Sequence, residues 1–204
     1  MLELIQPETI IDVGANKGQF SLAARYASPS ALILAFEPLA AAADIFELNF
    51  AKDPSTRLFR LALASQEGQM PFHVANRADS SSLLAPGEGS AAGYAVRADR
   101  IVDIPVKRLD QVLQTTDLKG LTLLKVDVQG TEPDVVLGAG ALLHRIDFIY
   151  LEASFVELYD RQMLAGDLVD TLSRLGFAWR GVFNRSVTRA FGPTQADLLF
   201  ERRR

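Results

Sequence analysis

Short apolar runs that alternate with amphipathic stretches constrain the fold of this chain more than any other feature of its sequence. TIIDVG (9–14), ALILAFE (31–37) and LTLLKVDV (121–128) are short and rich in branched apolar residues, which is typical of buried strands. Stretches with apolar residues at helical spacing, such as 19–27, lie between these runs. Strands that alternate with helices predict βα units and a mostly parallel sheet.

The pattern along the whole chain predicts the number and order of the elements. Core strands are expected at 9–14, 31–37, 58–63, 121–128, 146–152, 177–183 and 195–202. Helices are expected at 19–27, 40–50, 132–143 and 164–175. The last two strands have no helix between them, so we expect an antiparallel strand at that end. We therefore predict an α/β fold with a mostly parallel seven-stranded sheet, an antiparallel last strand and helices on both faces.

The middle of the chain, residues 65–99, differs from the rest because it is rich in glycine, serine and other small residues. Two short strands are predicted at 70–74 and 101–106. Long loops inside a compact domain are usually functional or disordered. We predict a single domain over residues 1–204, with an inserted flexible loop at about 76–99 that forms a lid or one wall of a site.

Composition excludes several classes of protein. The net charge of −4 and the isoelectric point near 5.2 disfavour a nucleic-acid-binding protein, which usually carries a basic patch. No apolar run approaches the roughly 18 residues of a membrane-spanning helix, and the first residues do not resemble a signal peptide. The chain has no cysteine, which excludes disulfides and thiolate metal sites and is compatible with a cytoplasmic location.

The segment after the first predicted strand is a candidate binding site for an anionic group. Gly14 allows a sharp turn, and Gly18 allows the backbone to approach a ligand before the next helix begins. The free N–H groups and the dipole at the start of that helix favour a carboxylate. The spacing of these glycines differs from the Gly-x-Gly-x-x-Gly of a dinucleotide site, and a simple tight turn explains it equally well.

Glu37, at the end of the second predicted strand, is a candidate ribose-binding residue. An ionised carboxylate accepts two hydrogen bonds and can take both ribose hydroxyls. Enzymes that bind NAD place an acidic residue at the corresponding position, so Glu37 predicts a ribose without choosing the cofactor. A surface acid at a strand end is the structural alternative.

Three further side chains are candidates for acid–base chemistry. Asp127 and Glu152 finish the fourth and fifth predicted strands, where they can bind an acceptor, act as a base or face a cation. Two acids are too few to assign a metal, and purely electrostatic roles remain open. His73, beside the long loop, is the third candidate base, since histidine is the common general base of proteins.

Six segments stand in a fixed order along the chain: IDVGANKGQF, AFEP, DSSSLL, LKVDVQGTEPDVVLGAGALL, IYLEASFVELY and QADLLFE. Together, from Thr9 to Phe200, they resemble the FkbM family of methyltransferases. The ordered set of DVGAN, FEP and DVQG-x-E makes the resemblance specific. It implies a single-domain class I (Rossmann-like) methyltransferase fold that carries out S-adenosylmethionine-dependent O-methylation, often of sugars or natural-product hydroxyls.

The resemblance also assigns residues and partners. It places the methyl donor against Asp12, Gly14, Asn16, Gly18, Glu37 and Pro38. Asp127 would then lie near the reactive end. The expected partners are S-adenosylmethionine and a hydroxyl-bearing small molecule or glycan. Family members often carry a segment before the first strand that helps to cover the pocket. How the acceptor side of this chain is closed is therefore left undecided. Two alternatives are a non-catalytic Rossmann-like binding module and an NAD(P)-dependent oxidoreductase.

Overall fold

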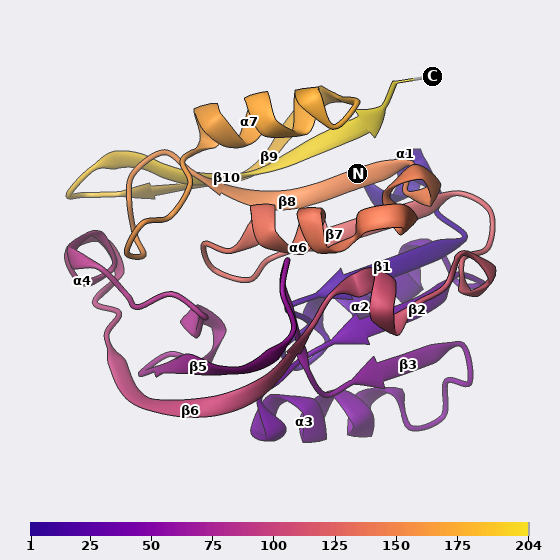
Figure 1. The fold of residues 1–204 in the computed structure, drawn as a ribbon, viewed down its shortest axis with the longest axis horizontal. Helices are drawn as coiled ribbons and strands as arrows, with labels where there is room; N and C mark the ends of the chain where they lie inside the picture. Colours follow the sequence, from indigo (N-terminus) through magenta and orange to yellow (C-terminus); the bar gives the residue numbers. More distant parts are fainter. Residues whose placement is uncertain (204) are drawn as a thin grey trace.

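A seven-stranded sheet forms the centre of the computed structural model, which describes residues 1–203 (Figure 1). Its strand order is β3 (Thr56–Phe59), β2 (Leu32–Phe36), β1 (Thr9–Val13), β7 (Thr122–Val126), β8 (Phe148–Ser154), β10 (Gly192–Arg202) and β9 (Phe177–Thr188). Neighbouring strands are parallel except at β10, which runs antiparallel to both β8 and β9. The predicted sheet with an antiparallel last strand is confirmed.

Helices cover both faces of the sheet, because the central strands bury residues on both of their sides. The main helices are α2 (Gln19–Ala27), α3 (Ala40–Phe50), α6 (Glu132–Gly138) and α7 (Ala165–Arg174). Short ones are α1 (Leu2–Ile5), α5 (Leu109–Val112) and the 3₁₀ turn η2 (Thr115–Asp117). Ala24 of α2 and Phe46 of α3 pack on one face, and Val135 of α6 and Leu172 of α7 pack on the other.

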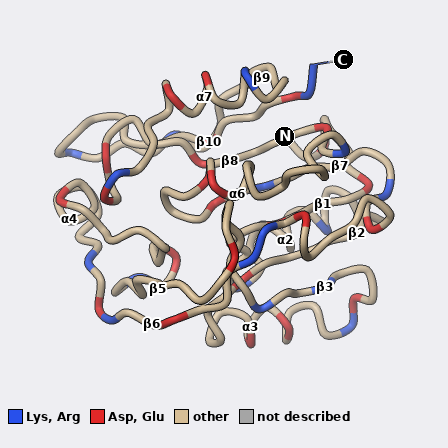
Figure 2. Tube along the Cα trace, in the orientation of Figure 1, with Lys and Arg blue, Asp and Glu red and all other residues tan. Residues whose placement is uncertain are grey.

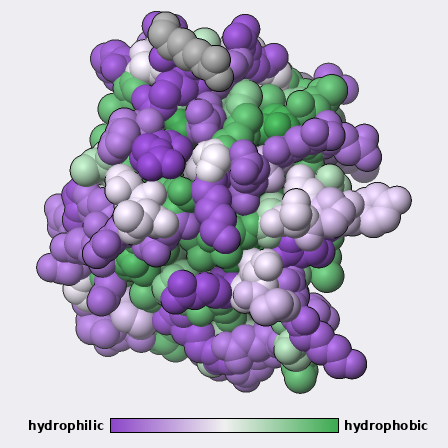
Figure 3. All heavy atoms as spheres, turned by 90° about the vertical axis from the view of Figure 1, so that its right-hand side faces the viewer, coloured by the Kyte–Doolittle hydropathy of each residue, from purple (hydrophilic) through white to green (hydrophobic). Residues whose placement is uncertain are grey.

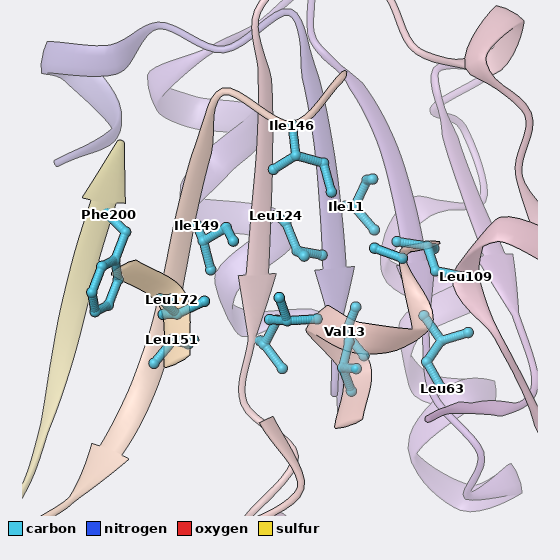
Figure 4. Close-up of a cluster of buried hydrophobic side chains, with 14 of the residues drawn as sticks. Ile11, Val13, Leu63, Leu109, Leu124, Ile146, Ile149, Leu151, Leu172 and Phe200 are labelled. Carbon is cyan, nitrogen blue, oxygen red and sulfur yellow. The ribbon is translucent and has the colours of Figure 1, made fainter. Parts of the chain in front are cut away.

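The larger core lies on the face covered by α6 and α7 (Figure 4). Ile11, Leu124 and Ile149 occupy the same level of three adjacent strands and are fully buried. Leu172 and Ile146 contribute to the same cluster. The middle of the sheet is therefore a rigid platform, and the loops at the carboxyl ends of its strands are built upon it.

A second, three-stranded sheet was not predicted as such. It consists of β4 (Ala62–Leu63), β6 (Ala98–Lys107) and β5 (Gly68–Ala75) in that order. The predicted strand 58–63 is therefore wrong in extent, because the chain leaves the main sheet at Arg60, whose side chain pairs with exposed acids of α3.

The predicted helix 132–143 also ends earlier than expected. A Cβ on Gly138 would lie 2.2 Å from the backbone oxygen of Ala64, and Gly140 has a φ of +46°. The helix α6 therefore ends at Gly138, because it approaches the end of strand β4 closely and because Gly140 is left-handed. The chain continues as the 3₁₀ turn η3 (Gly140–Arg145).

The segment predicted as an inserted loop contains regular structure. It forms the 3₁₀ turn η1 (Ala78–Ser80) and the helix α4 (Glu88–Tyr94). Ser82, Ser90 and Val96 are almost completely buried. Most of the other residues between 76 and 99 are exposed or partly exposed, so a few small side chains anchor the segment. Its mobility remains a prediction.

Charges are spread over the whole molecule. Lys and Arg lie on many elements and form no single basic face along the trace (Figure 2). The end of the molecule that lies at the right of Figure 1, away from α4, is covered mostly by hydrophilic side chains with smaller hydrophobic areas between them (Figure 3). Among residues 1–203, no helix has the length and apolar character needed to cross a membrane.

We predict that Leu124→Ala lowers the free energy of unfolding by about 2–5 kcal/mol, because it opens a cavity in the central strand β7. Leu22→Ala is the matched control, since Leu22 is 47 % exposed on α2, and its effect should stay within about 0.5 kcal/mol. Urea unfolding followed by circular dichroism measures both values. Equal effects of the two substitutions would contradict the placement of the core.

Candidate functional site

A cleft of about 550 Å³ opens at the carboxyl ends of β1, β2, β7 and β8. Ligands of open α/β sheets bind at this edge, near the point where the strand order reverses. Here the reversal lies between β1 and β7, which are adjacent in the sheet but far apart in the sequence. Six of the predicted site residues line the cleft: Gly14, Asn16, Glu37, Pro38, Asp127 and Glu152.

The turn after β1 depends on Gly14. Its φ is +73°, and an added Cβ would lie 1.8 Å from the backbone oxygen of Asp127. Only glycine combines this conformation with so close an approach to the end of β7. The turn leads into α2, whose first residues Gln19 and Phe20 also line the cleft. The N-terminus of α2 lacks a side-chain cap, so it is available to an anionic group.

Glu37 lies at the end of β2 with both carboxylate oxygens facing backbone donors. The N–H of Asn16 donates to Oε2 at 2.9 Å, and the N–H of Leu39 donates to Oε1 at 2.8 Å. Burial raises the pKa of Glu37, and these two hydrogen bonds partly offset that effect. Each oxygen keeps a further lone pair, so the carboxylate can still accept two hydroxyl groups.

Asn16 completes this corner of the cleft. Its φ of +48° is left-handed, a conformation that asparagine tolerates better than most residues. Its Oδ1 atom is buried without a hydrogen-bond partner among the described residues. Unsatisfied buried acceptors are rare in proteins. A ligand with a donor group would fit here, beside Glu37.

Asp12 lies beneath the cleft and does not line it. The Nζ atom of Lys125 forms an ion pair with Asp12 Oδ1 at 3.0 Å, and Ser21 Oγ donates to Oδ2 at 2.6 Å. Lys125 also donates to the backbone oxygens of Gly14 at 3.0 Å and Val13 at 3.3 Å. Asp12 thus supports the turn through Lys125, and its direct contact with the donor stays a prediction.

Lys125 was not predicted as a site residue, because it lies inside an apolar run that predicts only a buried strand. Burial alone would lower the pKa of Lys125, but the carboxylates of Asp12 and Asp127 outweigh it and raise that pKa. Lys125 is therefore a charged group under the site.

Two other predicted residues lie outside the cleft. A Cβ on Gly18 would lie 2.8 Å from the ring of Phe50, so this glycine permits packing of α2 against α3. His73 lies on β5, where its backbone pairs with Ser82, and its side chain does not line the cleft. These positions do not favour the predicted approach of a ligand to Gly18 or the predicted role of His73 as a base.

Asp127 and Glu152 come together through Gln129. The Nε2 group of Gln129 donates to Asp127 Oδ1 at 2.7 Å and to Glu152 Oε2 at 3.1 Å. Gln195 Nε2 donates to the same oxygen of Glu152 at 2.6 Å. Burial, with the nearby charge of Asp127, raises the pKa of Glu152 well above its usual range. Asp127 directly follows β7 as predicted, whereas Glu152 lies inside β8, which continues to Ser154. The roles of Gln129 and Gln195 were not predicted.

Glu132 shapes the loop that carries Asp127 and Gln129. Its carboxylate accepts hydrogen bonds from the N–H groups of Val128 at 3.2 Å and Gly130 at 3.0 Å. Burial raises the pKa of Glu132 to about 7, although the hydrogen bond from Gly130 opposes the rise. The glutamate of the D-V-Q-G-x-E segment therefore caps the loop from inside.

A second polar group closes the cleft toward the hairpin of β9 and β10. Tyr150 OH donates to Asp197 Oδ2 at 2.7 Å, and Asn184 Nδ2 donates to the same oxygen at 2.7 Å. Burial raises the pKa of Asp197, and the hydroxyl of Tyr150 opposes that rise. Among the described residues, no cluster of three or more His, Cys, Asp or Glu has the arrangement of a metal site.

Comparison with known proteins shows to which family this chain belongs. The family model described as the methyltransferase FkbM domain matches residues 12–178. The 2-O-methyltransferase NoeI of Sinorhizobium fredii is 31 % identical over 179 residues, which span 84 % of this chain and 73 % of NoeI. The chain belongs to the FkbM methyltransferase family.

Solved structures agree with the fold of this FkbM-family chain. The methyltransferase FkbM from Methylobacillus flagellatus superposes with a TM-score of 0.61 at 15 % identity, over 95 % of this chain and 44 % of that one. Magnesium protoporphyrin IX methyltransferase from Synechocystis, solved with bound S-adenosylmethionine, gives 0.53 at 12 % identity, over 95 % of this chain and 69 % of that one. The class I methyltransferase fold is confirmed, and the family makes S-adenosylmethionine the methyl donor.

We predict that Gly14→Ala abolishes binding of S-adenosylhomocysteine, because the new Cβ displaces the turn from the end of β7. Gly166→Ala is the matched control, since no atom lies within 4 Å of a Cβ at that position of α7. Isothermal calorimetry measures binding, and circular dichroism checks the fold. Normal affinity in a folded Gly14→Ala protein would contradict the role given to this turn.

The parent protein should lose stability as pH rises through about 7, because Glu132 then ionises in a buried position. We predict that Glu132→Gln removes this pH-dependent loss. The pKa of Glu132 is raised from 4.5 to about 7, so the native state keeps a proton that the unfolded chain has released. The contribution is full below about pH 4.5 and is lost as pH rises through about 7, by at most about 3 kcal/mol.

Urea unfolding of both proteins across this pH range tests the effect of Glu132. Exposed Glu88 is the matched position, and Glu88→Gln should retain the pH dependence of the parent. An unchanged pH dependence in Glu132→Gln would show that Glu132 titrates normally.

Proposed function

We propose that this FkbM-family protein transfers a methyl group from S-adenosylmethionine to a hydroxyl group of a small molecule or sugar. The observation that carries the proposal is the position of Asp127 and Glu152, which line the same cleft as Gly14, Asn16 and Glu37. Residues suited to a nucleoside and residues suited to a proton transfer thus share one space. NoeI, the relative described above, is named as a 2-O-methyltransferase.

The chain offers complementary groups for each end of the donor. Glu37 can accept the two ribose hydroxyls, and the buried Oδ1 of Asn16 can accept a further hydrogen bond. The uncapped N-terminus of α2 suits the carboxylate of the methionine part. The donor supplies a methyl group that is already activated by the positive charge of its sulfonium.

The protein's own contribution is alignment and proton transfer. We propose that Glu152 accepts the proton of the acceptor hydroxyl as the new O–C bond forms and the S–C bond breaks. Its raised pKa makes its ionised form a stronger base than an ordinary carboxylate. Gln129 and Gln195 fix the Oε2 atom of Glu152 and leave Oε1 to face the substrate. Asp127 adds negative charge that favours the cationic donor.

Calorimetry and a transfer assay test this function. S-adenosylhomocysteine should bind and NAD should not, since the family match argues against the oxidoreductase alternative. Transfer of a labelled methyl group to hydroxyl compounds should follow. Binding without any transfer would favour the non-catalytic module.

The proposal also places the activity in the cytoplasm. A chain without cysteine forms no disulfide bonds, so it gains no stability from an oxidising compartment.

We predict that Glu37→Ala weakens binding of S-adenosylhomocysteine at least tenfold, or about 1.4 kcal/mol, because two charge-assisted hydrogen bonds to the ribose are lost. Glu47→Ala is the control, because Glu47 is an exposed acid that pairs with Arg60 on the surface. Calorimetry gives both affinities, and thermal unfolding checks stability. Equal affinities of the two variants would remove Glu37 from the donor site.

A further inference from the structure

A second hollow, of about 260 Å³, adjoins the donor cleft. The two spaces share Asp79, Asp127, Gln129 and Glu152 in their walls. The hollow therefore adjoins the carboxylates to which we assign proton transfer, whereas Gly14 lines only the donor cleft. Any group held in it lies next to the reactive end of the proposed donor site.

Three parts of the chain that are distant in sequence build this hollow and are tied together by hydrogen bonds. Tyr94 of α4 shares a hydrogen bond of 2.6 Å with Thr194 of β10. Ser90 donates to the backbone oxygen of Leu158 at 2.6 Å, and Tyr159 OH donates to that of Ser80 at 2.8 Å. The hollow is thus a preformed cavity between α4, the loop after β8 and the β9–β10 hairpin.

The lining of the hollow is polar and acidic. Hydroxyl and amide side chains dominate it, and only Val96 and Leu158 are apolar. Its one cationic side chain among the described residues, Arg77, already pairs with Asp79 at 3.4 Å. Lys125 forms its ion pair with Asp12 and acts on Asp127 only through its charge, so a second carboxylate or a phosphate entering here would still meet like charge. A hydrocarbon would leave the polar lining unpaired.

The size of the hollow limits what it can hold. Pockets for drug-sized ligands measure about 300–1,000 Å³, so this space accommodates one ring-sized group or the end of a larger molecule. Ser186 of β9 lines it, whereas the next residue, Val187, is 58 % exposed and points to the other side of the strand.

We propose that this hollow is the acceptor subsite, and that it selects an uncharged polyhydroxyl group and excludes anionic analogues. The proposal rests on the proposed function, since it supplies the acceptor for that methyl transfer. Ser186 and Tyr94 act as specificity-determining residues, because they line this hollow and not the donor cleft.

Saturation-transfer NMR on the full chain tests the subsite with probes that differ in charge and in hydroxyl content. Methyl glucoside, the corresponding glucuronide and cyclohexanol are each added at millimolar concentration to protein saturated with S-adenosylhomocysteine. We expect contact with methyl glucoside, and titrations should give affinities weaker by about tenfold for the other two, which corresponds to about 1.4 kcal/mol. Ser186→Trp should remove the methyl glucoside signal, and Val187→Trp, the matched control, should keep it.

Each outcome bears on one of the two proposals. Absence of contact with methyl glucoside, equal contact with the glucuronide, or full contact in Ser186→Trp would overturn the subsite. Calorimetry with S-adenosylhomocysteine, run first on all three proteins, should give the same affinity for each. Failure of the parent protein to bind it would instead refute the proposed function, and a loss confined to Ser186→Trp would place Ser186 in the donor site and overturn the subsite.

Discussion

The ammonium group of Lys125 links most of the features of this site. It lies in the central strand β7, is almost completely buried, and satisfies its three donors with Asp12, Gly14 and Val13. Removing one partner of a buried ion pair typically costs about 3–5 kcal/mol, because the other charge is left uncompensated. The turn that we assign to the donor is therefore held from below by a charge, and not only by the shape of Gly14.

The positive charge of Lys125 also acts on the carboxylates above it. Asp127 and Asp197 both interact with Lys125, but its closest acidic partner is Asp12. Its charge is thus largely committed to the floor of the site. Glu152 and Glu132 are left in buried positions beside Asp127, and this explains why their pKa values are raised. A cationic donor complements such a site, and an anionic acceptor does not.

Features encoded by neighbouring residues could be predicted from the sequence. The core strands follow from apolar runs, and the positions of Gly14, Glu37 and Asp127 follow from the ends of those strands. Contacts between distant residues could not be predicted in this way. Ser82 reaches the backbone of Gln129 across 47 positions, and Gln195 reaches Glu152 across 43. Small residues in the middle of the chain therefore suggested flexibility, although Ser82 and Ser90 among them are buried. The packing role of Gly18 could not be predicted for a similar reason, since its partner Phe50 lies in another helix.

Gln129 connects the acceptor side of the molecule with the proposed proton acceptor. Its φ of +61° is unfavourable for a residue other than glycine, by about 1–3 kcal/mol, and persists only where neighbours hold it. Ser82 holds its backbone oxygen at 2.7 Å, and Tyr159 holds its side-chain oxygen at 2.9 Å. Both partners belong to segments that border the second hollow. A shift of either segment on acceptor binding would therefore move the amide that positions Asp127 and Glu152, so acceptor recognition and proton transfer depend on the same hydrogen bonds.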